Sequence, residues 1–103
     1  MNGYELHPAV LGDLDEIWEY IAEDNLDAAD RVIAEIFDSI RALVPFPHQG
    51  FPRPDLAASP LRFKLVRDFL IAYAPDEKPL LIIAVLHGRR SPRVMAAILR
   101  DRH

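Results

Sequence analysis

The chain has 103 residues, half of them hydrophobic, and a formal net charge of −4. This length suits one small core, so we expect residues 1–103 to form a single domain. There is no cysteine, which excludes disulfides and thiolate chemistry. The first residues lack a signal-peptide pattern, and the longest apolar run, Leu80 to Leu86, is far shorter than the ~20 residues of a membrane span. We therefore expect a cytoplasmic protein that does not enter the membrane.

Charge is distributed unevenly along the chain. Residues 1–51 carry eleven acidic and two basic side chains, a net charge of −9, whereas residues 52–103 carry ten basic and five acidic ones, a net charge of +5. This asymmetry predicts that a surface for an anionic partner comes from the second half of the chain.

The first half predicts a strand followed by two helices. Residues 4–7 alternate apolar and polar side chains, as a short strand does. Pro8 suits the first turn of a helix, and apolar residues then recur at spacings of three and four. After a short break, Asp27 is a candidate N-cap, with Asp30 three residues further on, for a second amphipathic helix that ends at Pro45. A turn this short predicts a helical hairpin.

A proline-rich loop and a β-hairpin follow. Residues 45–60 contain five of the nine prolines, which indicates a stiff connection. Residues 61–65 alternate strictly, and residues 69–73 form the return strand if Arg67 and Asp68 are the two residues of the turn.

The rest of the chain predicts a buried strand and a last helix. Residues 80–86 are apolar throughout, as in a central strand covered on both faces. Ser91 and Pro92 are typical of a helix N-terminus. The order β-α-α-β-β-β, with a short C-terminal helix, predicts an α+β fold whose helical hairpin packs on one face of a mainly antiparallel sheet.

The register of the β-hairpin divides its side chains between two faces, because residues paired across the strands share a face. One face is wholly apolar, and we expect it to meet the helical hairpin. The other face is mixed, and it is either covered by the last helix or exposed as an apolar patch edged with positive charge, which a monomer rarely shows without a use. The candidate residues of this mixed face are Arg62, Lys64, Phe69, Ile71 and Tyr73.

An ordered set of segments resembles the RelE/ParE superfamily, the toxins of type II toxin–antitoxin pairs. "HPAVLGDLDEIWEYIAEDN" is similar to the first helix of the family, and "DAADRVIAEIFDSIRAL" resembles the second. "FLIAY" and "VLHGRR" look like the last two strands. The positions that match the first helix are Pro8, Asp13, Leu14, Ile17, Tyr20 and Ile21, and the later landmarks are Pro47, Gly50 and Arg62.

Within this superfamily the chain is more similar to the ParE branch. That branch commonly ends its last strand in His-Gly-Ala-Arg or a close variant, which His87-Gly88-Arg89-Arg90 resembles. RelE-like members tend to carry an arginine where this chain has Leu70, and a histidine or tyrosine near the strand end. Here the arginine and the companion tyrosine are missing.

The candidate site residues lie where the last strand passes into the last helix. His87 is a candidate for proton transfer, but it is more simply a strand-end residue without catalytic companions. Arg89, Arg90 and Arg93 are the candidates for target binding, and Gly88 should provide a tight or positive-φ turn between strand and helix. Arg100 and Arg102 are expected to lie on a solvated helix face. No spacing of ligands indicates a metal, and no motif indicates a cofactor.

The resemblance implies a toxin that binds DNA gyrase and is neutralised by a cognate antitoxin in a heterodimer or heterotetramer. The mixed face of the β-hairpin is then the candidate surface for the antitoxin or the target. The first alternative is a RelE-like, ribosome-dependent mRNA endoribonuclease that needs no metal and holds phosphate with Arg62, Lys64 and the strand-end arginines. The second alternative is an inactive member that only binds its antitoxin.

Overall fold

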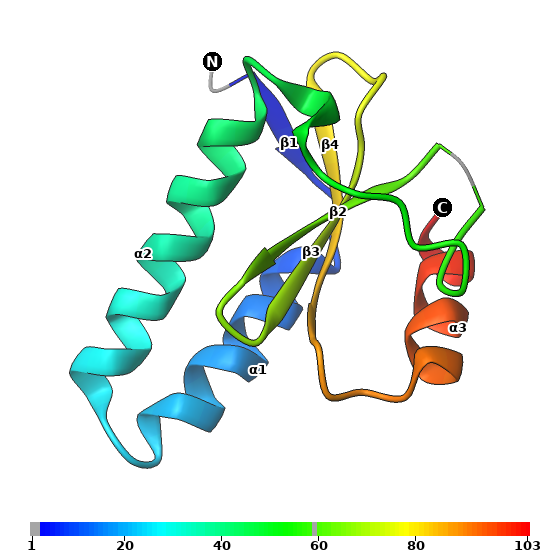
Figure 1. Cartoon of the computed structure of the whole chain (residues 1–103). Helices are drawn as coiled ribbons and strands as arrows, with labels where there is room; N and C mark the ends of the chain where they lie inside the picture. Colours follow the sequence, from blue (N-terminus) through cyan, green and yellow to red (C-terminus); the bar gives the residue numbers. More distant parts are fainter. Residues whose placement is uncertain (1–2, 59) are drawn as a thin grey trace.

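The computed structural model describes residues 3–58 and 60–103 (Figure 1). The predicted α+β order is confirmed. The elements are β1 (Tyr4–Leu6), α1 (Val10–Ala22), α2 (Leu26–Leu43), the 3-10 helix η1 (Pro47–Gln49), β2 (Arg62–Val66), β3 (Phe69–Ala74), β4 (Leu80–His87) and α3 (Pro92–Arg102).

In the described part of the chain, the strands form one sheet in the order β1-β4-β3-β2. β1 runs parallel to β4, and the other neighbours are antiparallel, so the sheet is mainly antiparallel as predicted. β4 is an inner strand because its side chains are apolar along almost its whole length. β1 pairs with β4 only as far as Ile82. The remaining edge of β4 therefore needs other hydrogen-bond partners.

The helical hairpin forms as predicted, but with a different cap. Asn25, not Asp27, is the N-cap of α2, and its side chain accepts a hydrogen bond from the backbone N–H of Ala28 at 3.0 Å. The helix begins at Leu26, so Asp27 lies inside its first turn, where a carboxylate still interacts favourably with the helix dipole. The indole N–H of Trp18 on α1 donates to Asp30 on α2 at 2.9 Å and links the two helices.

The predicted register of the β2–β3 hairpin is confirmed. Val66 pairs with Phe69 beside the turn, and Arg62 pairs with Tyr73 at the far end. Arg67, in the turn, adopts a left-handed backbone conformation with a φ of 53°.

A salt bridge ties this turn to α2. The guanidinium of Arg67 donates two hydrogen bonds of 2.7 Å to the carboxylate of Glu35. These hydrogen bonds hold the pKa of Glu35 below its ordinary value. Both side chains are substantially exposed, so solvent screens the pair and its stabilising effect is small.

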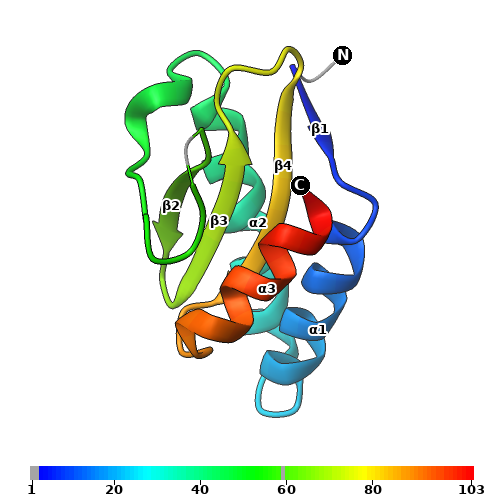
Figure 2. The same cartoon turned by 90° about the vertical axis from the view of Figure 1, so that its right-hand side faces the viewer.

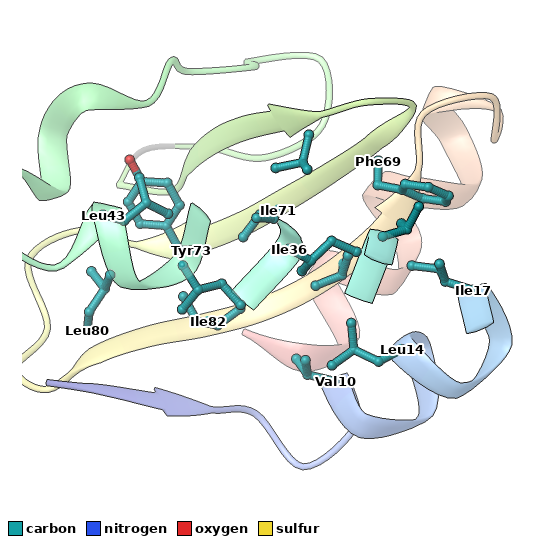
Figure 3. Close-up of a cluster of buried hydrophobic side chains, with 14 residues drawn as sticks. Val10, Leu14, Ile17, Ile36, Leu43, Phe69, Ile71, Tyr73, Leu80 and Ile82 are labelled. Carbon is teal, nitrogen blue, oxygen red and sulfur yellow. The ribbon is translucent and has the colours of Figure 1, made fainter. Parts of the chain in front are cut away.

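The assignment of the two faces of the β-hairpin is wrong. The mixed face, not the apolar one, meets the helical hairpin, and Phe69, Ile71 and Tyr73 are 5%, 0% and 0% exposed (Figure 3). These three residues lie on β3, inside the sheet, where α1 and α2 cover them. Arg62 and Lys64 lie on the edge strand β2, and an edge position lets long charged side chains reach out of an otherwise apolar layer.

The second face is covered by α3 and the proline-rich loop, so the expectation that α3 covers the mixed face is also wrong. The buried cluster on this side joins Leu56 and Leu61 of the loop with Leu70 of β3 and with Met95 and Leu99 of α3. Figure 2 shows α3 crossing this face of the sheet, on the side away from α2.

The proline-rich loop is anchored by a buried phenol. The hydroxyl of Tyr73 donates to the carbonyl of Pro47 at 2.6 Å and accepts from the backbone N–H of Gly50 at 2.9 Å. A Cβ at position 50 would lie 2.6 Å from the carbonyl oxygen of Phe63, so this approach requires glycine. Arg62 completes the anchor by donating to the carbonyls of Gly50 at 2.7 Å and His48 at 3.3 Å.

Candidate functional site

The site begins where β4 ends and the chain turns into α3. The N–H of Arg90 donates to the carbonyl of His87 at 3.0 Å, which closes a tight turn as predicted. Gly88 donates to the carbonyl of Asp68 at 2.7 Å, and a Cβ at Gly88 would lie 3.0 Å from that oxygen. Close approach therefore explains this glycine. The alternative of a positive φ is wrong, since Gly3 is the glycine with that conformation among the described residues.

The predicted start of α3 is confirmed. The hydroxyl of Ser91 accepts a hydrogen bond from the N–H of Val94 at 3.3 Å, and Pro92 occupies the first helical position. The cap fixes the point at which the chain leaves the turn, so the arginines on either side of it have defined positions relative to the sheet.

A cleft of about 300 Å³ opens between α1 and the end of β4. The side of α1 that faces it repeats at helical spacing, because residues three, four and seven positions apart share a helix face. The cleft is lined by apolar side chains of α1, β3 and β4 and by polar side chains at its mouth. The lining residues are Asp13, Glu16, Ile17, Tyr20, Phe69, Val85, His87 and Arg90.

His87 stands in this cleft between two aromatic rings. Its ring meets Phe69 edge-on at a centroid distance of 5.0 Å and Tyr20 at 6.0 Å. Its Nδ1 accepts a hydrogen bond from the backbone N–H of Arg89 at 3.1 Å. This hydrogen bond occupies Nδ1, so Nε2 is the ring nitrogen that remains for another partner.

Arg90 is tied across the mouth of the cleft. Its guanidinium lies 3.3 Å from the carboxylate of Glu16 on α1. Arg90 is 41% exposed and Glu16 is 72% exposed, so this pair is open to solvent and easily exchanged for another partner.

Arg102 is not on a solvated face, contrary to the expectation. Its guanidinium donates to both oxygens of Asp13, at 2.6 Å and 2.8 Å, and the two side chains are only 14% and 11% exposed. The hydrogen bond to Asp13 raises the pKa of Arg102 further above its ordinary value. The helical pattern of α1 does not distinguish Asp13 from its other acidic residues. The sequence contains no signal that pairs Asp13 with Arg102, 89 positions away.

The same pair completes the edge of β4 that β1 leaves open. Asp13 accepts a hydrogen bond from the N–H of Val85 at 3.0 Å, and Arg102 donates to the carbonyl of Ile83 at 3.2 Å. The pair therefore joins α1, β4 and α3 at the back of the cleft, and it has a structural role.

The predicted site residues do not all come together. His87, Arg89 and Arg90 lie in one strand-to-helix segment, with Arg93 in the first turn of α3. Arg62 lies at the other end of the sheet, because it pairs with Tyr73, whereas His87 pairs with Phe69.

The basic residues expected to bind phosphate in an endoribonuclease therefore do not form one cluster. Lys64 pairs with Ile71 on the edge strand, between the two ends. Arg62 also donates its hydrogen bonds to carbonyls of the proline-rich loop.

Other kinds of site are not evident in residues 3–58 and 60–103. This part of the chain contains no group of three or more histidine and acidic side chains that could hold a metal ion. None of its helices is long and apolar enough to cross a bilayer.

The fold and the comparison with known proteins define the class. The chain combines a strand, a helical hairpin and a meander with a basic segment after the last strand. Residues 4–92 match the family described as "ParE toxin of type II toxin-antitoxin system, parDE", and the chain belongs to this family. The curated protein "Putative toxin Y4kP" of Sinorhizobium fredii (strain NBRC 101917 / NGR234) is 34% identical over 89 residues, which cover 80% of this chain and 84% of the relative.

Proposed function

We propose that this ParE-family chain inhibits growth by binding DNA gyrase through the strand-end surface formed by Arg89, Arg90 and Arg93, and that a cognate antitoxin neutralises it. The observation that carries the proposal is the exposure of these three arginines in one segment after β4. Arginine forms directional hydrogen bonds to carboxylates and is enriched at the energetic centres of protein interfaces.

The antitoxin needs a surface other than the mixed face of the β-hairpin. Phe69, Ile71 and Tyr73 are buried beneath α1 and α2, so contact with them would require the core to open. Tyr20, at the mouth of the cleft, is 59% exposed and offers an aromatic contact that costs no rearrangement.

The alternative is a RelE-like, metal-independent endoribonuclease. The observation in its favour is the cleft itself, which gathers His87, Tyr20, Glu16 and Arg90. Two observations weigh against it. The Nδ1 of His87 already accepts a backbone hydrogen bond, and Leu70, where RelE-like chains tend to carry arginine, is buried beneath α3.

The test separates the two targets. The chain is induced in cells without an antitoxin, and plasmid supercoiling and transcript integrity are measured together; purified gyrase and translating ribosomes are then assayed side by side. We expect relaxed or broken DNA and intact transcripts. Cleaved transcripts with normal supercoiling would establish the endoribonuclease instead, and normal growth would indicate an inactive antitoxin-binding protein.

The first prediction concerns the strand-end surface. The double variant R89A/R90A should weaken inhibition of gyrase by about tenfold or more, which is the loss expected when interface arginines are truncated. Its melting temperature should stay close to that of the wild type, because Arg90 contributes only an exposed salt bridge. Arg31→Ala is the matched control, since Arg31 is also exposed but lies on α2. Equal inhibition by R89A/R90A and wild type would show that the target binds elsewhere.

A further inference from the structure

The arginines of the chain differ in what holds them. Within residues 3–58 and 60–103, five pair with carboxylates, and Arg62 is held by backbone carbonyls. Arg31, Arg89, Arg93 and Arg100 are exposed and have no carboxylate within ion-pair distance in that part of the chain. Arg31 lies alone on α2, whereas the other three lie in or just before α3.

Their positions on α3 place them on its outer face. Arg93 and Arg100 are seven residues apart, which is two helical turns and about 10 Å along the axis. Met95 and Leu99 face the sheet and are buried, so Arg93 and Arg100 point the other way. Ala97 lies between the two arginines on the same exposed side, and Arg89 is exposed in the turn just before the helix.

The charge of the molecule is divided between the two sides of the sheet. Residues 10–44, which include α1 and α2, carry ten acidic and two basic side chains, whereas residues 88–102 carry five basic and one acidic. Figures 1 and 2 show the helical hairpin and α3 on opposite sides of the sheet. A polyanion is therefore repelled by the hairpin and attracted to α3.

We propose that the outer face of α3, with Arg89, Arg93 and Arg100, binds the phosphate backbone of duplex DNA without reading its sequence. The binding needs no gyrase and goes beyond the proposed function. Arginine forms strong bonds to phosphate, and the small side chain of Ala97 lets the helix approach the backbone closely. The major groove of B-DNA accommodates a helix, whereas the deep, narrow groove of duplex RNA does not.

The composition of this face favours DNA over a protein or a single strand. The row between Arg93 and Arg100 contains only Ala97, with no aromatic side chain on which a base could stack. The exposed apolar side chain beside this row is Val94, which is smaller than the aromatic anchors around which protein interfaces are usually built.

The experiment measures binding of a labelled 20-base-pair duplex to the purified full chain by fluorescence anisotropy. Three phosphate contacts predict a slope of about −2.7 in log K against log salt, or about 40-fold weaker binding at 200 mM than at 50 mM salt. Changing the sequence of the duplex should leave the affinity unchanged.

Variants assign the contacts. Arg100→Ala should reduce the slope by about 0.9, and R89A/R93A/R100A should bring it close to zero. Arg31→Ala, an exposed arginine on the acidic side, should leave both affinity and slope unchanged. Circular dichroism of each variant checks that the fold persists.

Four results would overturn the inference: no binding by the wild type at 50 mM salt, an unchanged slope in the triple variant, tighter binding to duplex RNA, or binding to poly-glutamate but not to DNA. The last would assign the face to an acidic protein segment. The gyrase assay is separate. DNA binding without gyrase inhibition would defeat only the proposed target, and gyrase inhibition without DNA binding would defeat only this inference.

Discussion

The hydroxyl of Tyr73 shows how one polar atom can organise a loop. The ring is buried among the side chains beneath α2, while the hydroxyl reaches Pro47 and Gly50 at the start of the proline-rich segment. The N–H of Gly50 is buried and would otherwise lack a partner, while the hydrogen bond to Pro47 is partly buried. Tyr73 is therefore a structural residue. The alternation of side chains in the sequence places it on β3 but does not reveal these hydrogen bonds.

Replacing this tyrosine measures the anchor. Tyr73→Phe keeps the ring but leaves the buried N–H of Gly50 without its acceptor, which should lower the free energy of unfolding by about 2 kcal/mol. Urea denaturation followed by circular dichroism would measure the loss. A change below about 0.5 kcal/mol would mean that the loop does not depend on this hydroxyl.

The same variant has a distinctive pH dependence. Burial raises the pKa of Tyr73 in the folded chain, so folding favours the neutral phenol. The corresponding stability is fully present below the unfolded pKa of about 10 and is lost as the pH rises towards the folded pKa. The stability advantage of the wild type over Tyr73→Phe should therefore shrink above about pH 10 and stay constant from pH 7 to 9. Denaturation of both proteins across this range, in parallel, removes the effects of all shared groups.

Among the elements, α1 has the most demanding position, because it contacts α2, the edge of β4 and the last turn of α3. Asp13 makes the last two contacts through Val85 and Arg102. A carboxylate this little exposed depends on these donors for the hydrogen bonds that water would otherwise supply.

Breaking this pair should be costly. Arg102→Met leaves Asp13 charged and without its main partner, and the free energy of unfolding should fall by about 3 kcal/mol. Arg90→Met removes the exposed pair with Glu16 and should cost less than about 1 kcal/mol, which makes it the matched control. Thermal denaturation of the two variants gives the comparison. If both lose the same amount, burial of the Asp13–Arg102 pair has no energetic weight.

A substitution elsewhere on α1 should stabilise the fold. Gly12 lies inside the helix, and a Cβ built there meets no atom within 4 Å. Gly12→Ala should therefore raise the free energy of unfolding by about 0.8 kcal/mol, since alanine restricts the unfolded chain and favours the helix. The expected readout is a higher urea midpoint with an unchanged slope. A lower midpoint would show that the space around Gly12 does not accept a methyl group.

At the scale of the whole molecule, the order of elements and the strand register could be predicted because they depend on local periodicity. The alternation in residues 61–65 and the turn at Arg67 determine which residues pair. They do not determine which face the helices cover. The composition of the two faces predicted that the helical hairpin covers the apolar one. The position of each residue in the sheet explains why it covers the mixed face instead: Phe69, Ile71 and Tyr73 lie on a central strand, while the two cations beside them lie on an edge strand.

The candidate site shows the same limit. The segment from His87 to Arg93 is contiguous, so its position after the last strand could be predicted from the sequence alone. The cleft could not, because Glu16 and Tyr20 come from a helix some 70 residues earlier in the chain. Neither could the role of Arg102, whose partner is just as distant and carries no motif.

The pairing of Asp13 with Arg102 also has a consequence for synthesis of the protein. A ribosome makes α1 early, but β4 and the guanidinium that complete its surroundings come only at residues 80–102. Contacts that span most of the chain form late and depend on nearly all of it being present. A chain released before this point lacks both its closing contact and the arginines after β4. An interrupted message would therefore yield fragments without the Asp13–Arg102 contact, and those that end within β4 would also lack the basic surface.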